Sequence, residues 1–360
     1  MLARQLLFLV LAGLFVLSCD SSVNSGDEEE EEKPDEGVEE VYIPENTATE
    51  NVVVITLDGV RWQEVFGGAD STLVRNRLYI SGDYNRVWDD YWSDDEDERR
   101  KMLMPFFWNE LVNIGKIYGN RKYDNKVSVT NSSLKSFPGY AEIWNGYADR
   151  TITANKPPVN NNQTIIEFLS KQSGFEGNKI AITAAASSFT DLFHESENNF
   201  TISAGHKDLT VYNKTIRLME NDKPRFVYMA INKTDHWAHE SEYDTYLNLI
   251  HEADEFIKGV WDFIEQDSFY KGKTTLFITT DHGRGVGGDW HTHGSGGVEH
   301  AEETWFAVIG PDTKPTGEQK EEADIKASQF AKTLAAFLEM HFDTGKAKGV
   351  PIKSVMDNAE

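Results

Sequence analysis

The sequence predicts an α/β domain, a three-layer sandwich in which a mainly parallel sheet carries helices on both faces. Two observations support this prediction. Five short runs rich in Val, Ile, Phe and Thr mostly lack the alternation of a half-exposed strand, as expected for a sheet buried on both sides. Segments with apolar residues at helical spacing lie between these runs, and such alternation of strands and helices favours parallel pairing.

The strand and helix candidates follow one another along the chain. The predicted strands are residues 52–57, 180–183, 226–231, 275–279 and 305–309. Helical periodicity is present in residues 104–114, 164–170, 243–265 and 325–340. Residues 70–101 fit neither pattern, because they combine five aromatic residues with a dense charge cluster. We expect this insertion to be either an excursion near the functional site or a surface loop with a small core of its own.

The composition narrows the class of protein. A chain of 360 residues suits one large or two small domains, and an apolar fraction of 39% excludes disorder throughout. The net charge of −25 argues against a nucleic-acid-binding surface. A single cysteine excludes a disulfide framework and a Cys-rich zinc site, whereas ten histidines leave a site of His and carboxylate ligands open.

The N-terminal residues are expected to lie outside the fold. Arg4 and the apolar run Leu6–Leu17 are typical of a secretory signal, and Ser18-Cys19 resembles the end of a bacterial lipoprotein cleavage box. We expect a signal peptide over residues 1–19 and a lipid on Cys19 that attaches the protein to a membrane of the bacterial cell envelope, on the periplasmic or cell-surface side. The alternative is a plain secretory signal.

A charged tether is expected to follow the cysteine. Residues 20–50 hold 13 acidic residues and one lysine, so the segment repels itself and stays extended. Residues 51–360 are then expected to form a single domain that includes the insertion.

Acidic and histidine side chains follow three of the predicted strands. In a parallel sheet the carboxyl ends of the strands share one edge, and ligands bind there. Carboxylates and imidazoles gathered at one edge repel or desolvate one another unless a cation holds them. Each piece alone is more often a turn, a surface pair or a cap, but their joint occurrence favours a metal site. The residues at or beside these strand ends are Asp58, Asp235, His239, Asp281, His282 and His293.

A serine ahead of an apolar helical stretch supplies a candidate nucleophile. Pro138 in the first turn predicts that Ser136 is the N-cap of a helix. Capping alone would explain this pattern. However, a hydroxyl beside the free N–H groups of a helix start also lies where a phosphoryl group would bind, and a neighbouring metal ion would activate it.

Taken in this order, the motifs resemble those of the alkaline phosphatase superfamily, specifically its branch of type I phosphodiesterases and nucleotide pyrophosphatases. VVVITLDGVR is similar to the first strand and metal-binding Asp of that family, and SFPGYAEIWNG to its nucleophile segment. DHWAH and FITTDHG resemble its Asp-x-x-x-His and Asp-His pairs. His293-Gly294, followed by WFAVIGP, resembles its last ligand and last strand.

The resemblance implies an alkaline-phosphatase-like fold and two divalent metal ions, usually zinc, with manganese or iron as alternatives. It implies that Asp235, His239 and His293 bind one ion, with His291 and His300 as alternatives to His293. It implies that Asp58, Asp281, His282 and the oxygen of Ser136 bind the other ion. Ser136 would be the nucleophile, and Asn155 is the nearest match to an Asn that contacts a phosphate oxygen in the family.

The nucleophile segment departs from the family pattern. Ser136 stands where this branch usually has Thr, and Gly139 and Tyr140 replace Asn-His, so the phosphate pocket is expected to differ in shape. The sulfatase branch is disfavoured, because its C/S-x-P-x-R motif needs an arginine where Tyr140 stands. The phosphoglycerate mutase branch carries a large second domain, for which the chain between Ser136 and Asp235 leaves limited room.

The expected function is hydrolysis of a phosphomonoester or phosphodiester, with a small-molecule or nucleotide-type substrate, through a phosphoserine on Ser136. Two alternatives stay open. The same residues would serve a phospho-group transferase, including a mutase-like one, or the protein is a metal-bound surface lipoprotein without activity. Arg284, after the Asp-His-Gly turn, is a further candidate for the rim of the site.

Overall fold

The computed structural model describes residues 42–155, 160–193, 200–294, 297–347 and 349–357. The predicted signal peptide, Cys19 and most of the predicted tether lie outside the described residues. Thr47 and Thr49, at the end of that tether, hydrogen bond to Glu339 and Asp312, so the ordered body begins before Asn51. None of the described helices combines the length and the apolar character needed to cross a membrane.

The centre of the domain is an eight-stranded sheet in the order β10-β2-β9-β7-β1-β6-β4-β5. All five predicted strands belong to it, and each end agrees with the prediction to within one residue. Only β9 runs antiparallel to its neighbours, β2 and β7. The strands are β1 (Asn51–Leu57), β2 (Lys116–Tyr118), β4 (Ile180–Ala184), β5 (Thr201–Ser203), β6 (Phe226–Ile231), β7 (Thr274–Thr279), β9 (Phe306–Ile309) and β10 (Gly317–Glu318).

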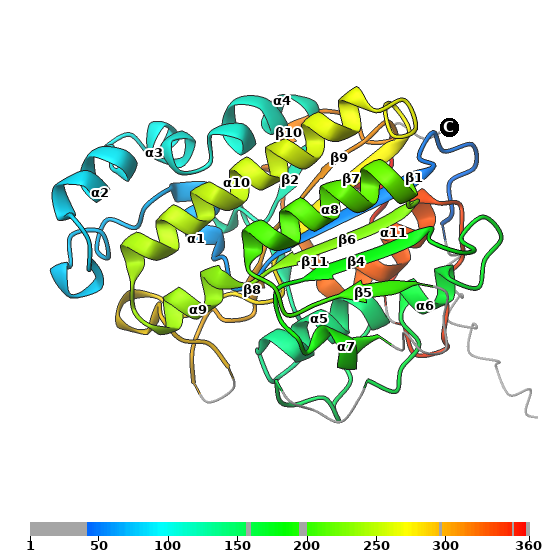
Figure 1. Ribbon diagram of the computed structural model, residues 1–360. Helices are drawn as coiled ribbons and strands as arrows, with labels where there is room; N and C mark the ends of the chain where they lie inside the picture. The colour runs from blue at the N-terminus through cyan, green and yellow to red at the C-terminus, as the bar shows by residue number, and fades with distance from the viewer. Residues whose placement is uncertain (1–41, 156–159, 194–199, 295–296, 348, 358–360) are drawn as a thin grey trace, which may run out of the picture. The chain divides into compact units, whose positions relative to one another are not determined.

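Helices cover both faces of this sheet (Figure 1). The side chains of β1 show why: Val52 and Val54 join one hydrophobic core, whereas Val53, Ile55 and Leu57 join another. The first core is closed by α5 (Ser136–Asn145), α6 (Ile165–Leu169), α7 (Phe189–Leu192) and α11 (Phe330–Phe337). The second is closed by α1 (Trp62–Gly67), α3 (Glu96–Leu103), α8 (Asp208–Asp222) and α10 (Tyr243–Gln266). The predicted three-layer α/β sandwich is therefore confirmed.

Two helix predictions were wrong in part. Within residues 104–114 the structure has a π-helical turn (Phe107–Leu111) and the short α4 (Val112–Ile114). Ala323–Lys326 forms β11, which pairs with β3 (Asn125–Ser128) in a small second sheet that also contains β8 (Glu303–Thr304). A short 3₁₀ turn (Ala327–Gln329) then leads into α11. Strand pairing across the chain overrides the local helical periodicity at Ile325.

The insertion at residues 70–101 forms a small core of its own, and its role near the functional site stays a prediction. It contains a 3₁₀ turn (Arg77–Tyr79), α2 (Tyr84–Tyr91) and most of α3. Trp88 and Trp92 contact each other with ring centroids 4.9 Å apart, and the Arg75 guanidinium stacks on both rings, which makes a small satellite core. Tyr79 also packs edge-on against Trp290, which lies in the loop between β7 and β9.

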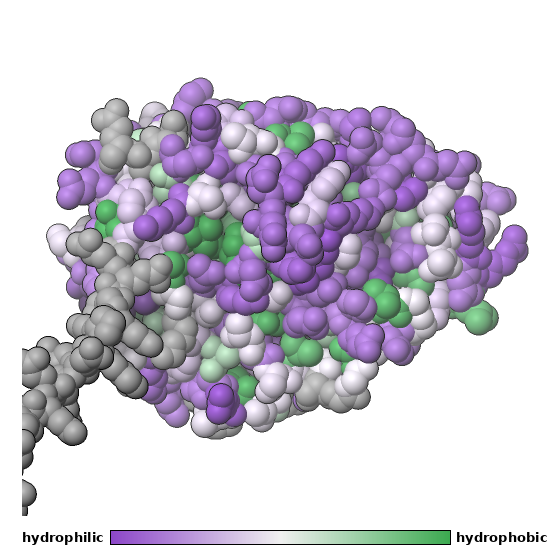
Figure 2. Space-filling model, turned by 180° about the vertical axis from the view of Figure 1, so that it is seen from behind, coloured by the Kyte–Doolittle hydropathy of each residue, from purple (hydrophilic) through white to green (hydrophobic). Residues whose placement is uncertain are grey.

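The surface on the side opposite to the view of Figure 1 is mostly hydrophilic, and its hydrophobic residues form separate small patches (Figure 2). Few large hydrophobic side chains among the described residues are exposed, and they belong to different elements. They are Leu78, Ile114, Tyr123, Leu209 and Val286. Scattered exposed side chains of this kind are normal for a folded domain.

Candidate metal centre and nucleophile

The strand order brings the predicted ligands to one edge of the sheet. β7, β1 and β6 are neighbours and run parallel, with Thr56 level with Thr279 on one side and Ala230 on the other. Their carboxyl ends therefore lie together. β9 is antiparallel, so its first residue, Phe306, pairs with Thr279 and the loop that precedes it reaches the same edge.

One set of side chains, the histidine group, consists of Asp235, His239 and His293. Asp235 and His239 lie one turn apart on α9 (Lys233–His239) and so share a face. Nε2 of His239 lies 2.9 Å from Nε2 of His293 and 3.5 Å from Oδ2 of Asp235. Nε2 of His293 lies 3.3 Å from Oδ1 of Asp235. The two histidines approach different oxygens of Asp235, and an ion about 2 Å from each ligand atom fits among three side chains so spaced.

A second set, the carboxylate group, consists of Asp58, Asp281 and His282. Nε2 of His282 lies 3.4 Å from Oδ1 of Asp58 and 3.3 Å from Oδ2 of Asp281. All three side chains are buried. His282 also links the two groups, because its Nε2 lies 3.9 Å from Oδ1 of Asp235.

Backbone contacts fix the tautomers of two histidines. Nδ1 of His293 lies 2.8 Å from the carbonyl oxygen of Leu134, and Nδ1 of His282 lies 2.9 Å from that of Gly283. A carbonyl oxygen only accepts, so each Nδ1 carries the proton and donates it. The Nε2 atoms, which face the carboxylates, are left with free lone pairs, as metal ligation requires.

Two glycines allow the close packing at this edge. Gly59 has a φ of +63°, and a Cβ there would lie 3.0 Å from Oδ1 of Asp235. Gly139, on α5, approaches the backbone of Asp281 so closely that a Cβ would lie 2.2 Å from its carbonyl oxygen. Gly139 therefore lets the helix of Ser136 pack directly on the Asp281 segment.

The charges of the site are not balanced by the described side chains. Burial, with repulsion from Asp235, raises the pKa of Asp58 to about 7, and burial with repulsion from Asp58 raises the pKa of Asp281 far above its usual range. Burial lowers the pKa of His282 to about 4, so this imidazole is neutral at pH 7. Burial acts against ionisation of Asp235, but the Arg284 guanidinium holds its pKa well below the usual range.

A divalent cation fits this donor set. Oδ2 of Asp281 is buried and has no hydrogen-bond partner among the described residues, although it lies among groups that could share a metal ion. A cation would satisfy this orphaned oxygen and offset the repulsion between carboxylates. Mixed imidazole and carboxylate ligands suit zinc, and also manganese or iron.

Ser136 lies beside the carboxylate group. Its Oγ is 3.4 Å from Oδ1 of Asp58 and 3.2 Å from Nε2 of His282. Its predicted role as N-cap was wrong: Lys135 is the N-cap and makes no side-chain cap, and Ser136 is the first helical residue. The hydroxyl is free for the site because the N–H of Phe137 instead donates to Oδ1 of Asn155, at 3.1 Å.

The side chain of Asn155 therefore lies beside the first turn of α5, close to Ser136. Both line a cavity of about 180 Å³ that also includes Asp58, Asp235 and Tyr140. A larger cavity of about 440 Å³ lies between residues 130–133 and 147–153. Residues 130–133 precede Ser136 in the chain and residues 147–153 precede Asn155, but neither Ser136 nor Asn155 lines this larger cavity.

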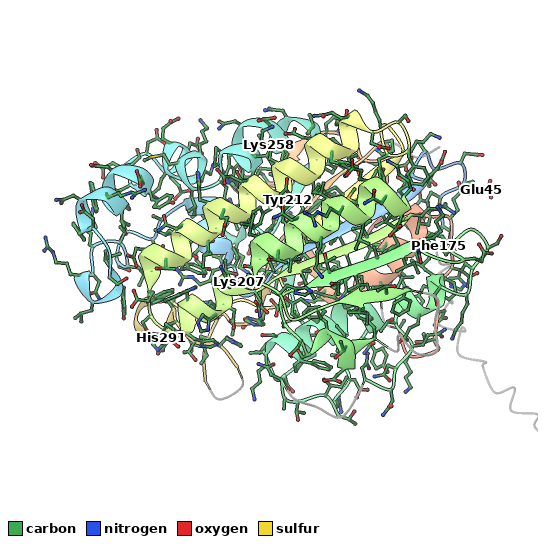
Figure 3. The ribbon with its side chains drawn as sticks, in the orientation of Figure 1. Glu45, Phe175, Lys207, Tyr212, Lys258 and His291 are labelled. Carbon is green, nitrogen blue, oxygen red and sulfur yellow. The ribbon has the colours of Figure 1, made fainter. Side chains whose placement is uncertain are left out.

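Three residues from the sequence analysis have a different place from the one expected. Arg284 is not on a rim: it is fully buried, and its Nη1 donates to Oδ1 of Asp235 at 2.5 Å. The carbonyl oxygen of His291 accepts from Arg284, and His291 lies on the loop beside α9 (Figure 3). His300 pairs with Glu303 at 3.0 Å. The ligand atoms near enough to share an ion group Asp235 and His293 with His282, and Asp58 and Asp281 with His282. His239, His291 and His300 belong to neither group, although Nε2 of His239 lies 2.9 Å from Nε2 of His293.

Known proteins share the sequence pattern and the fold of this chain. The sequence profile of the Metalloenzyme superfamily matches residues 113–340, more than half of the chain. None of the curated proteins matches the sequence.

Solved structures of the alkaline phosphatase superfamily have a similar fold. A Vibrio parahaemolyticus protein of that superfamily is 15% identical with a TM-score of 0.53, over 86% of this chain and 72% of that one. The lipoteichoic acid synthase LtaP of Listeria monocytogenes is 12% identical with a TM-score of 0.57, over 88% and 79%. Inactive murine ectonucleotide pyrophosphatase/phosphodiesterase 5, in complex with AMP, is 11% identical with a TM-score of 0.53, over 86% and 99%. A 2-O GAG sulfatase is also among the matches.

Proposed function

The chain belongs to the Metalloenzyme superfamily, and from this membership and the geometry of the site we propose that it is a metal-dependent hydrolase of phosphate esters with Ser136 as its nucleophile. The observation that carries the proposal is the position of the Ser136 hydroxyl. It stands at the start of a helix, 3.4 Å from Asp58 and 3.2 Å from His282, beside a buried and unbalanced set of charges.

The proposed ligands divide into two sets. Asp235, His239 and His293 would hold one divalent ion, and Asp58, Asp281, His282 and the oxygen of Ser136 would hold the second. Zinc suits both sets best, and manganese or iron is the alternative. When bound, such ions neutralise the charge that develops on the ester and lower the pKa of hydroxyl groups and water beside them.

The chain's own residues would carry out two displacements at phosphorus. Ser136 gives its proton to solvent and attacks phosphorus from its place at the start of α5. The bond from Ser136 Oγ to phosphorus forms as the bond to the leaving alcohol oxygen breaks, which gives a phosphoserine, and the leaving oxygen takes a proton from solvent. Water then attacks phosphorus and gives up a proton, while the bond to Ser136 Oγ breaks and Oγ is protonated again as the phosphate product leaves. Each step needs in-line geometry, so the protein contributes mainly positioning and electrostatic stabilisation.

Asn155 would orient the substrate. Its Oδ1 already accepts the N–H of Phe137, so its Nδ2 remains to donate to a phosphate oxygen. The 440 Å³ cavity, bounded by the loop that leads into Ser136, would take the organic part of the ester. Its lining is rich in hydroxyl and amide groups and holds one acidic and one basic side chain, Asp149 and Arg150, which favours a hydroxylated substrate. This character is compatible with a nucleotide-type ester.

The preference for phosphate over sulfate rests on the nucleophile segment. Tyr140 stands where the sulfatase motif has an arginine, and it is buried against the first core.

We also propose that a lipid on Cys19 anchors the protein in the bacterial cell envelope. Persistence of a Cys19→Ala variant in the membrane fraction would contradict that anchor.

Hydrolysis of two chromogenic esters tests the proposed activity. The zinc-loaded protein is assayed with p-nitrophenyl phosphate and bis-p-nitrophenyl phosphate, beside Ser136→Ala and the control Ser268→Ala. We expect Ser136→Ala to abolish turnover without losing metal, whereas Ser268→Ala retains both, because Ser268 is exposed in the segment before β7, at the end of that strand opposite to Asp281. The faster substrate distinguishes monoesterase from diesterase. Undiminished turnover in Ser136→Ala would refute the nucleophile, and no turnover in the metal-loaded protein would refute the hydrolase.

A further inference from the structure

The loop of residues 130–135 connects the two halves of the candidate site. Its end leads into Ser136, and the carbonyl oxygen of Leu134 accepts the Nδ1–H of His293 at 2.8 Å. Through this contact the loop determines which nitrogen of His293 faces Asp235 and His239. The position of the loop therefore bears on the nucleophile and on one proposed metal ligand together.

A single buried carboxylate, that of Glu142, holds the start of this loop. Glu142 lies on α5, two turns after Ser136, and its side chain is fully buried. Its carboxylate accepts from the N–H of Thr130 at 2.8 and 2.9 Å and from the hydroxyl of Thr130 at 2.7 Å. It also accepts from the N–H of Asn131 at 2.8 Å and from its Nδ2 at 3.0 Å.

The contact continues from Asn131 to the metal ligand. Oδ1 of Asn131 accepts the N–H of Leu134 at 2.9 Å, and the carbonyl oxygen of Leu134 accepts from His293. An unbroken series of hydrogen bonds thus leads from Glu142 through Asn131 and Leu134 to the imidazole. Hydrogen-bond partners of this kind orient metal-binding histidines and set their basicity.

The backbone of Leu134 needs such support. Its φ of +50° places it in the left-handed region, which costs a residue with a Cβ about 1–2 kcal/mol. A conformation of this kind persists where the surroundings over-determine it. Here Asn131, itself held by Glu142, fixes the N–H side of Leu134, and His293 fixes the carbonyl side.

The contacts of Glu142 require a carboxylate. All of its hydrogen-bond partners among the described residues are donors, namely the N–H and hydroxyl of Thr130 and the N–H and Nδ2 of Asn131. A glutamine in the same place would turn an NH₂ group toward at least one of these donors and would leave a buried N–H without an acceptor.

We infer that Glu142 is a positioning residue of the metal centre: it fixes the 130–135 loop, and through Asn131 and Leu134 it sets the orientation and tautomer of His293. The inference rests on the part of the proposed function that gives His293 to a metal ion. It does not depend on which ester is hydrolysed, or on whether Ser136 is the nucleophile.

Metal binding by Glu142→Gln tests this inference without any assay of turnover. Zinc affinity is measured by competition with a chromophoric chelator, and the visible spectrum of the cobalt-substituted full chain reports the ligand geometry. We expect roughly 10- to 100-fold weaker binding of one ion and a changed cobalt spectrum. The second ion, held by the carboxylate group, should be affected less.

Glu167→Gln is the matched control. Glu167 is also a buried glutamate, and its Oε2 accepts the N–H of Thr164 at 2.9 Å in the capping box of α6, which contains none of the proposed ligands. The substitution should lower thermal stability while leaving zinc affinity and the cobalt spectrum as in the wild type. An equal spectral change in Glu167→Gln would overturn the inference, because the effect would then come from general destabilisation.

The outcome is decided even if Glu142→Gln fails to fold. Asn131→Ala removes the middle of the series and keeps Glu142, and it should weaken binding of the same ion and change the same spectrum. If Glu142→Gln folds and has the zinc affinity and cobalt spectrum of the wild type, the role of Glu142 is refuted. If Glu142→Gln does not fold, the same result in Asn131→Ala refutes it. Failure of ester hydrolysis would leave these metal readouts intact, so the two proposals fail separately.

Discussion

Two clusters of buried charge flank Gly59, and they are built in opposite ways. On one side, Arg61 and Glu64 are both fully buried and paired. Tyr243 donates to Glu64 at 2.9 Å, and Nη1 of Arg61 donates to the carbonyl oxygen of Gly285 at 2.9 Å. This cluster satisfies its own charges.

On the other side, the metal-ligand cluster brings three carboxylates together with a single guanidinium. Arg284 pairs with Asp235. No lysine or arginine among the described residues pairs with Asp58 or Asp281, and Oδ2 of Asp281 has no hydrogen-bond partner among them. The comparison shows that burial of charge does not by itself indicate function. What distinguishes the candidate site is buried charge that the protein leaves unbalanced.

Asp281→Asn should break the unbalanced cluster with the largest effect. The amide keeps the acceptor for the N–H of Gly59, which lies 3.1 Å from Oδ1, but it removes a metal ligand. We expect loss of one metal ion and a fall in ester hydrolysis of roughly 10³-fold, equivalent to about 4 kcal/mol of activation free energy. Metal analysis and initial rates measure both.

In the absence of metal, the same substitution should leave the unfolding temperature unchanged or raise it. Because burial and the neighbouring Asp58 raise the pKa of Asp281, its carboxyl costs stability near neutral pH when no metal ion is bound, and the metal-free Asp281→Asn protein should unfold at the same temperature as the metal-free wild type, or at a higher one. A marked loss of stability in the metal-free variant would mean that Asp281 has an unrecognised structural partner.

Glu64→Gln should break the balanced cluster and give the reverse pattern. It leaves the Arg61 guanidinium buried without its partner, since the nearest other carboxylate, that of Asp70, lies 3.9 Å away and is partly exposed. Removing one member of a buried pair costs about 3–5 kcal/mol of unfolding free energy. Denaturant unfolding measures this loss. Metal content below the unfolding transition should stay at the wild-type value. Loss of metal from a folded variant would show that metal binding depends on the Arg61–Glu64 pair.

The sequence was sufficient to predict the position of site residues that come directly after a strand. Asp58 and Asp281 come directly after buried apolar runs, and the parallel order of β7, β1 and β6 brings them together. Which residue binds which ion is still a prediction. The superfamily and the fold are established, whereas the phosphodiesterase branch is supported by the motifs alone.

What the sequence could not reveal depends on contacts between distant segments. Arg284 looks like a surface residue after a turn, and only the packing of α9 against its loop makes it the partner of Asp235. Glu142 looks like an ordinary helical glutamate among apolar neighbours. A charged residue in the middle of an apolar helix was the one available signal, because such a residue must find donors or remain exposed.

Asp254 provides a further comparison. Like Asp58 of the metal-ligand cluster it has a raised pKa, but it has no proposed role in metal binding. Burial raises the pKa of Asp254 to about 7, the same value as for Asp58. Its carboxylate instead accepts the N–H groups of Phe106 at 2.7 Å and Phe107 at 3.0 Å, next to the π-helical turn. A raised pKa at a structural cap should affect stability and leave metal binding and hydrolysis unchanged.

The sign of the effect follows from proton binding. Between about pH 4, where the carboxyl ionises in the unfolded chain, and about pH 7, the folded state holds a proton that the unfolded state has lost. The contribution of Asp254 to stability therefore falls as the pH rises through this window. Asp254→Asn has no such proton, so the unfolding free energy of the wild type relative to the variant should fall by roughly 2–3 kcal/mol between pH 5 and pH 8. Denaturant unfolding at both pH values, on proteins of equal metal content, measures this difference. A difference that is constant with pH would show that Asp254 titrates normally, and a loss of hydrolysis in the variant would place it in the site after all.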